Sequence, residues 1–142
     1  MTIVILLRIA SSIMLLHLIG HSFGQNRWKI DENPLIKEVA QKLMGTKFRN
    51  MGVFRNMGDY FDGYGYSATI SMCIFVVVLW LASGASLSPS PFLNQVLLTL
   101  GIAIAILSII EFKYFFPLAA IMSLLAALLV LISWYLLQSA KI

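Results

Sequence analysis

The chain has 142 residues, enough for one domain, and 60% of them are apolar whereas 11% are charged. Soluble domains are nearer half apolar and a quarter charged, so this composition and a mean hydropathy of +0.90 are typical of an integral membrane protein. One cysteine excludes a disulfide-stabilised secreted domain, and the net charge of +4 does not indicate nucleic-acid binding, because the basic residues flank apolar segments.

Four apolar runs, over residues 3–23, 64–83, 92–110 and 114–137, are each long enough to cross about 30 Å of hydrocarbon as a helix. An open sheet is excluded there by its unpaired backbone groups. The first run could also be a signal peptide, but Arg8 inside it and the lack of a small-residue cleavage motif favour a retained helix. We therefore predict an all-α fold, an up-and-down membrane bundle of four helices in a single domain. Turns are expected at residues 83–91 and 111–113, and Pro117 in the first turn of the last helix.

The connection over residues 24–63 is too long to be a simple turn. Within it, apolar residues of the segment 34–44 recur at helical spacing opposite charged ones, after helix-start signals at residues 31–34. This pattern predicts an amphipathic helix, lying on the membrane face or packed on the end of the bundle. Residues 48–52 and 54–58 both read Phe-Arg-Asn-Met-Gly, but two copies are too few for a repeat architecture.

The distribution of lysine and arginine predicts the orientation. Eight of the ten lie in the long connection or at Lys113, whereas Arg8 and Lys141 lie on the opposite side. The positive-inside rule then puts the connection 24–63 in the cytoplasm and both termini outside.

In such a bundle most ionisable side chains collect at one membrane face. This candidate binding cluster, which we term the polar mouth, comprises His17, His21, Arg55, Asp59, Asp62 and Glu111. The two histidines share a helical face, where they could hydrogen-bond a neighbouring helix, handle protons or bind a ligand. A metal site is a weak interpretation, because no third ligand follows at a fixed spacing.

The acidic residues of the polar mouth have structural and functional interpretations. Asp59 and Asp62 could cap the second membrane helix, with Arg55 as a local ion-pair partner, or point into the mouth beside His21. Glu111 lies at a helix C-terminus, where the dipole disfavours an anion, so Lys113 or Arg55 is its expected partner. His21 is expected to matter more than His17, because it lies nearer the level of Arg55 and Asp59.

Glycines predict where helices approach closely. Gly20-x-x-x-Gly24 in the first helix, and Gly63 and Gly65 at the start of the second, would let two backbones come together.

The run over residues 52–65, with Gly20-His21 before it and a Tyr-Phe-Phe-Pro segment ending at Pro117 after it, resembles a group of uncharacterised small bacterial membrane proteins of four helices, DoxX-like in general build. The resemblance covers nearly the whole chain. The positions that match are His21, Arg55, Asp59, Gly63, Gly65 and Pro117. The sequence departs at Gly58, where the group often has an aromatic residue, and in its extra Asp62. The resemblance implies the four-helix fold and a bacterial plasma (inner) membrane location, and it brings no activity.

The sequence contains no phosphate loop, nucleophile elbow, HExxH, CxxC or haem motif. We therefore expect no catalytic residue, cofactor or metal, and favour a non-enzymatic binding or accessory membrane subunit. One alternative is a membrane enzyme or redox partner acting on a lipid or quinone, with His21 and Asp59 in acid–base roles and Arg55 holding an anionic headgroup. Another is a proton or small-ion carrier using His17, His21 and Glu111. The expected partners are membrane lipid and a lipid or quinone ligand, with homo- and hetero-oligomers both open.

Overall fold

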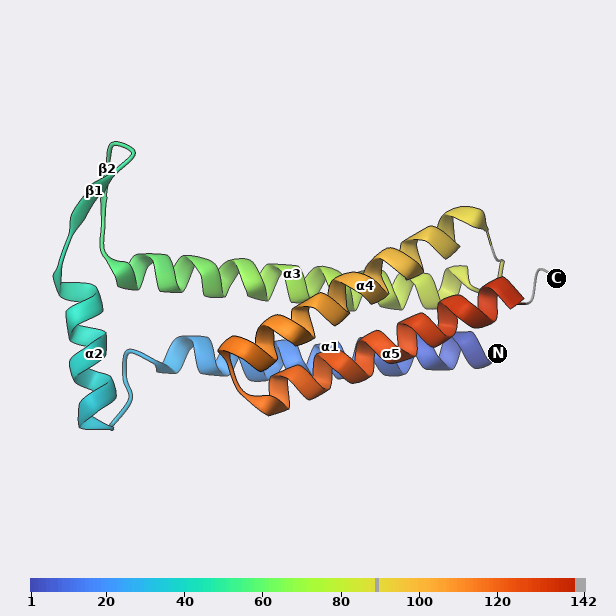
Figure 1. The fold of residues 1–142 in the computed structure, drawn as a ribbon, viewed down its shortest axis with the longest axis horizontal. Coiled ribbons are helices and arrows are strands. Elements are labelled where there is room, and N and C mark those ends of the chain that lie inside the picture. Colours follow the sequence, from blue (N-terminus) through green and yellow to red (C-terminus); the bar gives the residue numbers. More distant parts are fainter. Residues whose placement is uncertain (89, 140–142) are drawn as a thin grey trace. The chain divides into compact units, whose positions relative to one another are not determined.

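The computed structural model of the chain describes residues 1–88 and 90–139, with residue 26 described by its backbone alone (Figure 1). These residues form five helices and one short hairpin, which are α1 (Thr2–Arg27), α2 (Pro34–Gly45), β1 (Phe48–Asn50), β2 (Val53–Arg55), α3 (Met57–Ala85), α4 (Pro91–Tyr114) and α5 (Pro117–Ser139). The predicted all-helical class is confirmed, and the hairpin is a small addition to it.

Four of the helices, α1, α3, α4 and α5, are long and apolar enough to cross a membrane. They correspond to the four predicted apolar runs, but α3 begins at Met57 rather than near residue 64. Many large apolar side chains on these helices are exposed, including Ile109 at 68% and Phe112 at 75%. Such a surface is suited to contact with lipid chains rather than water.

Side-chain caps begin two of the helices, one of them among the helix-start signals at residues 31–34. The side chain of Asn33 accepts a hydrogen bond from the Leu35 amide before α2, and Ser90 does the same for Leu93 before α4. Each cap is followed by a proline at the first helical position, where a missing N–H costs nothing.

The predicted turn at residues 111–113 is wrong. Glu111 and Lys113 lie in the last turn of α4, and the chain turns at Phe115 and Phe116 instead. The reason is Pro117, whose ring disfavours helical geometry in the residue before it, so that the break falls next to the proline and not at the charges.

The hairpin uses a two-residue loop between β1 and β2. Asn50 pairs with Val53 across it, and both loop residues have positive φ, 49° at Met51 and 87° at Gly52. Positive φ at both central positions is the geometry of a type I′ turn, which matches the twist of the two strands.

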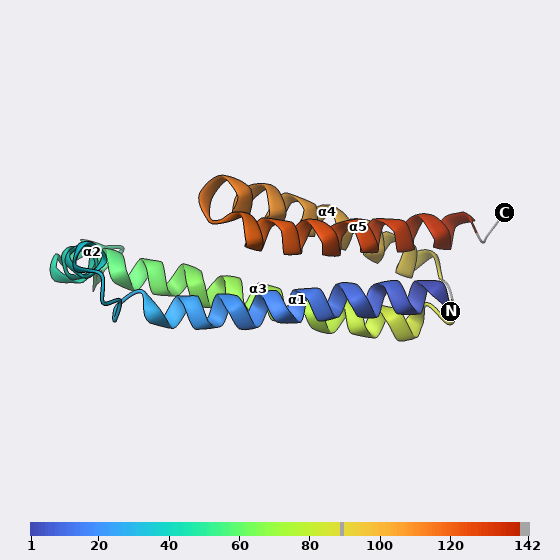
Figure 2. The ribbon, with the colours of Figure 1, turned by 90° about the horizontal axis from the view of Figure 1, so that it is seen from below.

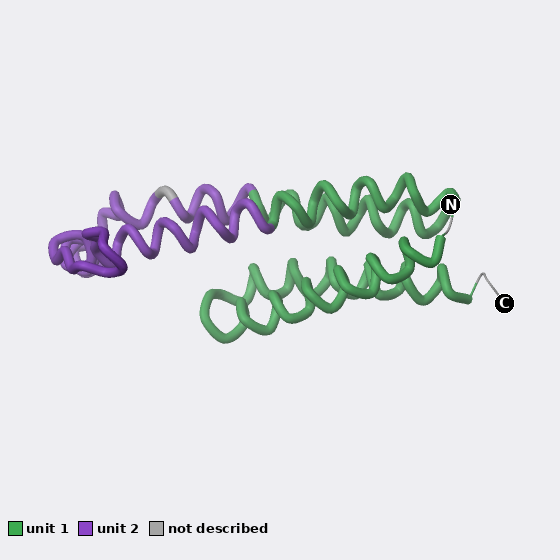
Figure 3. Tube along the Cα trace, turned by 90° about the horizontal axis from the view of Figure 1, so that it is seen from above, with its two compact units in different colours: residues 1–18, 72–142 green, residues 19–71 purple. Residues whose placement is uncertain are grey.

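The chain divides into two compact units (Figure 3). Unit 1 comprises Met1–Leu18 and Met72–Ile142, and unit 2 comprises Ile19–Ser71. In unit 1, α4 and α5 lie side by side as an antiparallel pair (Figures 1 and 2). They pack tightly at Gly101, where an added Cβ would lie 2.5 Å from the Leu131 side chain.

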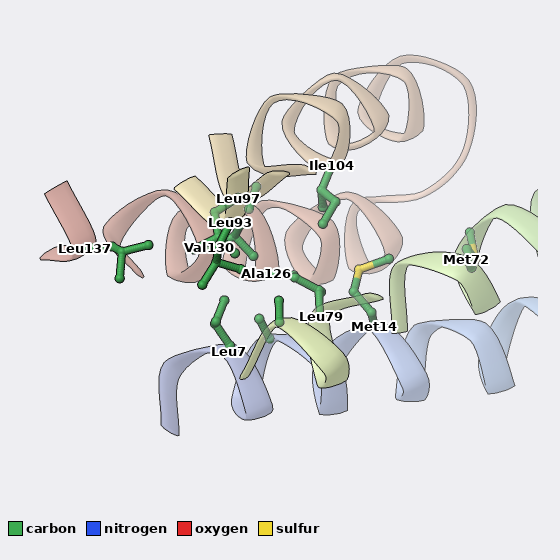
Figure 4. Close-up of a cluster of buried hydrophobic side chains, with 13 residues drawn as sticks. Leu7, Met14, Met72, Leu79, Leu93, Leu97, Ile104, Ala126, Val130 and Leu137 are labelled. Atoms are coloured by element: carbon green, nitrogen blue, oxygen red, sulfur yellow. The ribbon is translucent and has the colours of Figure 1, made fainter. Parts of the chain in front are cut away.

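The core of unit 1 draws on α1, α3, α4 and α5 (Figure 4). Its larger buried members are Leu7, Met14, Met72, Leu79, Leu93, Leu97, Ile104, Val130 and Leu137. Small residues fill the remaining positions, such as Ala126 and Ala127 on α5. The hydroxyl of Ser11 on α1 donates to the Val76 carbonyl of α3 at 2.9 Å, which ties these two helices inside unit 1.

Candidate functional site

Three polar side chains from three helices meet inside unit 1, and we term them the buried triad. They are His17 of α1, Glu111 of α4 and Ser123 of α5. The His17 Nε2 atom lies 3.4 Å from Glu111 Oε1, and its Nδ1 atom lies 3.2 Å from Ser123 Oγ. The side chains of His17 and Glu111 are 7% and 4% exposed, and Ser123 is fully buried. A buried ionisable pair between two helices of membrane length is rare, and it marks a candidate functional site.

The second carboxylate oxygen of Glu111, Oε2, is buried and has no hydrogen-bond partner among the described residues. One turn earlier on α4, the hydroxyl of Ser108 donates to the Ala120 carbonyl of α5 at 2.8 Å. A second polar contact therefore lies one turn from Glu111 along the α4–α5 contact, while Oε2 has no hydrogen-bond partner among the described residues.

The expectation that Glu111 pairs with Lys113 is wrong for the described residues, because its ion-pair partner within unit 1 is His17. Pairing of Glu111 with Arg55 would join the two units and stays a prediction. Lys113 is two residues further along α4, about 200° around the helix, and therefore points away from Glu111. Its ammonium instead lies 5.0 Å from the centre of the Tyr114 ring.

In unit 2, the half-buried His21 of α1 donates through Nε2 to the Gly65 carbonyl of α3 at 3.1 Å. A Cβ at Gly65 would overlap the Gln25 side chain, so the predicted close approach is confirmed at this glycine. It is wrong for Gly20, Gly24 and Gly63, where no described atom outside the chain neighbours and the helix's own backbone lies within 4 Å of an added Cβ.

Asp59 acts as a helix cap. Its Oδ2 accepts from the Asn56 amide at 3.0 Å, and the Asn56 side chain accepts from the Asp59 amide at 2.8 Å. This reciprocal pair is a capping box, and it explains why α3 starts at Met57. The expected ion pair with Arg55 is not among those formed by the described residues; the guanidinium donates to the Phe54 carbonyl at 3.0 Å instead.

Asp62 binds two residues that sequence reasoning missed, Trp28 and Lys29. The Trp28 indole donates to Asp62 Oδ1 at 2.9 Å, and the Lys29 ammonium forms an ion pair with Oδ2. The hydrogen bond to Asp62 raises the pKa of Lys29 above its ordinary value. Because the folded pKa of Lys29 exceeds the unfolded one, the charged lysine stabilises the fold at neutral pH, and this contribution is lost as the pH rises through the folded pKa of Lys29. Asp62 thus links the two residues that follow α1 to α3 within unit 2.

A groove of about 430 Å³ lies beside the capping box in unit 2. Its lining comprises Val53, Arg55, Asp59, Tyr60, Gly63, Tyr64 and Ser67. The groove thus joins one guanidinium and one carboxylate with two tyrosines at the start of α3.

The six predicted residues of the polar mouth therefore fall into four local arrangements. His17 and Glu111 belong to the buried triad of unit 1, while Arg55 and Asp59 line the groove of unit 2. Within unit 2, His21 is bound to Gly65, and Asp62 to Trp28 and Lys29. The convergence of unit 2 residues with Glu111 involves both units and stays a prediction.

Among the described residues, no group of three histidine, cysteine, aspartate or glutamate side chains is placed to hold a metal ion. The chain matches no protein-family model, no curated protein and no solved structure.

Proposed function

We propose that this chain is a multi-pass membrane protein that acts as a non-catalytic binding subunit, and that its ligand is the headgroup of a membrane phospholipid. The observation that carries the proposal is the groove of unit 2, which combines a carboxylate and two tyrosines with an arginine that forms no ion pair among the described residues, at the start of a membrane-length helix. The proposed setting is a bacterial plasma membrane, crossed by an up-and-down bundle of the kind found in DoxX-like proteins. Its termini lie outside, and the α2 connection lies in the cytoplasm with α2 on the membrane surface.

The expected level of the groove in the bilayer matches that of a lipid headgroup. With 29 residues, α3 is roughly 43 Å long, whereas the hydrocarbon layer is about 30 Å thick. The first turns of α3, which carry Asp59, Tyr60 and Tyr64, therefore extend into the headgroup region. Tyrosine is enriched at that level of the bilayer, because its ring is apolar and its hydroxyl is polar.

The charges of the groove suit a phosphate next to a primary ammonium. The Arg55 guanidinium offers several N–H donors in a plane, a geometry that matches phosphate oxygens. Asp59 uses Oδ2 in the capping box, and its Oδ1 forms no hydrogen bond among the described residues, so this oxygen can accept from an ammonium. Together these two charges select a zwitterionic aminophospholipid over an anionic lipid.

A matched pair of arginine variants tests this proposal. We expect Arg55→Gln to reduce retained phosphatidylethanolamine about tenfold in native mass spectrometry, because one charge-assisted bond to the phosphate is lost. The control is Arg49→Gln, which removes the same charge from β1 of the same hairpin but lies outside the groove lining. Wild-type protein should retain phosphatidylethanolamine in preference to phosphatidylcholine, whose quaternary ammonium has no N–H to donate.

Equal loss of lipid in the two arginine variants would contradict the groove as the binding site, since only the net charge would then matter. Retention of a quinone that neither variant disturbs would contradict the ligand class. The membrane-enzyme alternative draws no specific support, because His21 is bonded to the Gly65 carbonyl and Asp59 caps α3.

A further inference from the structure

We infer that His17, Glu111 and Ser123 form a proton-binding site inside unit 1, in which one exchangeable proton is shared between the imidazole and the carboxyl group. This inference is independent of the proposed lipid groove, which lies in unit 2 and shares no residue with the buried triad.

Charge balance in an apolar setting is the first argument. With a neutral imidazole and an ionised carboxyl, the triad carries one negative charge, and no lysine or arginine is buried among the described residues to offset it. One added proton makes it neutral overall, whether the proton sits on His17 or on Glu111. A net charge within a membrane span is costly, so the apolar surroundings favour retention of this proton.

Hydrogen bonding in the triad permits both positions of the proton. A serine hydroxyl can donate to the Nδ1 atom of a neutral ring, or rotate and accept from the Nδ1–H of an imidazolium. Ser123 Oγ lies 3.2 Å from His17 Nδ1 and can therefore serve both states. When the carboxyl holds the shared proton, it lies on Glu111 Oε1 facing His17 Nε2, and the ring keeps its Nδ1–H, which donates to Ser123 Oγ.

The two groups of the pair are adjacent without forming a tight salt bridge. The 3.4 Å between His17 Nε2 and Glu111 Oε1 is longer than the roughly 2.7 to 2.9 Å of a closed charge-assisted hydrogen bond. A contraction of about half an ångström would bring them to the distance at which a proton is shared.

No third charge of the described part of unit 1 faces the triad. On α1, Arg8 is about 13 Å further along the helix and lies over the Trp80 ring. On α3, the unit 1 segment bears no charged side chain and its cysteine, Cys73, is exposed. On α4, Lys113 lies over Tyr114, and on α5 the titratable side chain, Tyr135, is exposed and about three turns from Ser123.

The triad lies a short distance from one end of α4. Glu111 is three residues from the end of α4 at Tyr114, which is roughly 4.5 Å along the helix axis. Protons would therefore exchange with the membrane face at which α4 ends.

Carboxyl labelling with dicyclohexylcarbodiimide, which reacts with protonated carboxyl groups in apolar surroundings, tests the inference on the full chain in lipid nanodiscs. We expect mass spectrometry to find Glu111 labelled near neutral pH, and labelling to fall as the pH rises. The exposed Glu38 of α2, paired with Lys42, should stay unlabelled under the same conditions and serves as the internal control. His17→Gln, which keeps a polar side chain but removes the second proton position, should move the labelling midpoint by about one pH unit.

If the His17→Gln variant fails to fold, a measurement on the wild-type chain tests the inference instead. The chain has two histidines, so imidazole nitrogen-15 spectra of the wild type contain two rings. The spectrum of one ring should change with the same midpoint as the carboxyl C=O infrared band, because a shared proton couples the two groups. Absence of Glu111 labelling at every pH, or a labelling midpoint unmoved by His17→Gln in folded protein, or unequal midpoints in the wild type, would overturn the inference.

Discussion

Replacing His17 with leucine is expected to lower the free energy of unfolding by about 2 to 3 kcal/mol, measured by denaturation in mixed lipid–detergent micelles. The change leaves the buried Glu111 carboxyl without its imidazole partner and removes the contact to Ser123. The loss stays in this range because the carboxyl can take up a proton and become neutral. The double variant His17→Leu with Glu111→Leu should recover most of the stability, since no polar group of the pair is then left buried alone.

His21→Leu is the matched control for this prediction. It removes the other histidine, whose ring makes one hydrogen bond to the Gly65 carbonyl, so about 0.5 to 1.5 kcal/mol is expected. The larger cost is expected at His17 because it is buried between two partners, whereas His21 is half-buried with one. The expectation that His21 matters more than His17 to binding at the polar mouth stays a prediction. A larger loss from His21→Leu than from His17→Leu would contradict the role given to the buried triad.

Gly101→Leu should cost about 1 to 3 kcal/mol of unfolding free energy in the same assay, because the α4–α5 contact has no room for a side chain. Even a Cβ there would lie 2.5 Å from Leu131 Cδ2 and 2.8 Å from its Cγ. Adding Leu131→Ala to this variant makes space on α5 and should restore part of the stability.

Gly84→Leu on α3 is the control for the change at Gly101. No other described atom lies within 4 Å of an added Cβ at Gly84, and leucine has the higher helix propensity. Its expected effect is neutral to slightly stabilising. Equal losses at Gly84 and Gly101 would mean that the cost does not come from the contact with Leu131.

The sequence was sufficient to predict the long helices and several of their ends. Apolar runs of membrane length predicted α1, α3, α4 and α5, and proline with a preceding cap residue predicted the start of α2. The start of α3 was missed because its cap, Asn56, lies in the second copy of a pentapeptide whose first copy forms a strand and turn. Identical residues thus took different structures, which local sequence could not distinguish.

Partners across helices were not predictable in the same way. His17 and Glu111 are 94 residues apart, and helices that are apolar all round do not reveal which face is buried. A usable signal was the spacing of small and polar residues. On α4, the buried residues Leu97, Gly101, Ile104, Ser108 and Glu111 recur every three or four positions, which marks one stripe that includes the carboxyl group.

The hairpin also bears on how this chain tolerates changes of length. Because residues 48–52 and 54–58 are identical, deleting the six residues 48–53 would leave Lys47 followed by the same Phe-Arg-Asn-Met-Gly before Asp59. Asn56 and Asp59 would keep their capping box, whereas the chain would lose the β1–β2 pairing, Val53 of the groove lining, and the Tyr60 contacts of Phe48 and Asn50. The repeated pentapeptide is of the kind that a tandem duplication within a reading frame produces in a single step, and here the added copy supplies a strand and part of the groove.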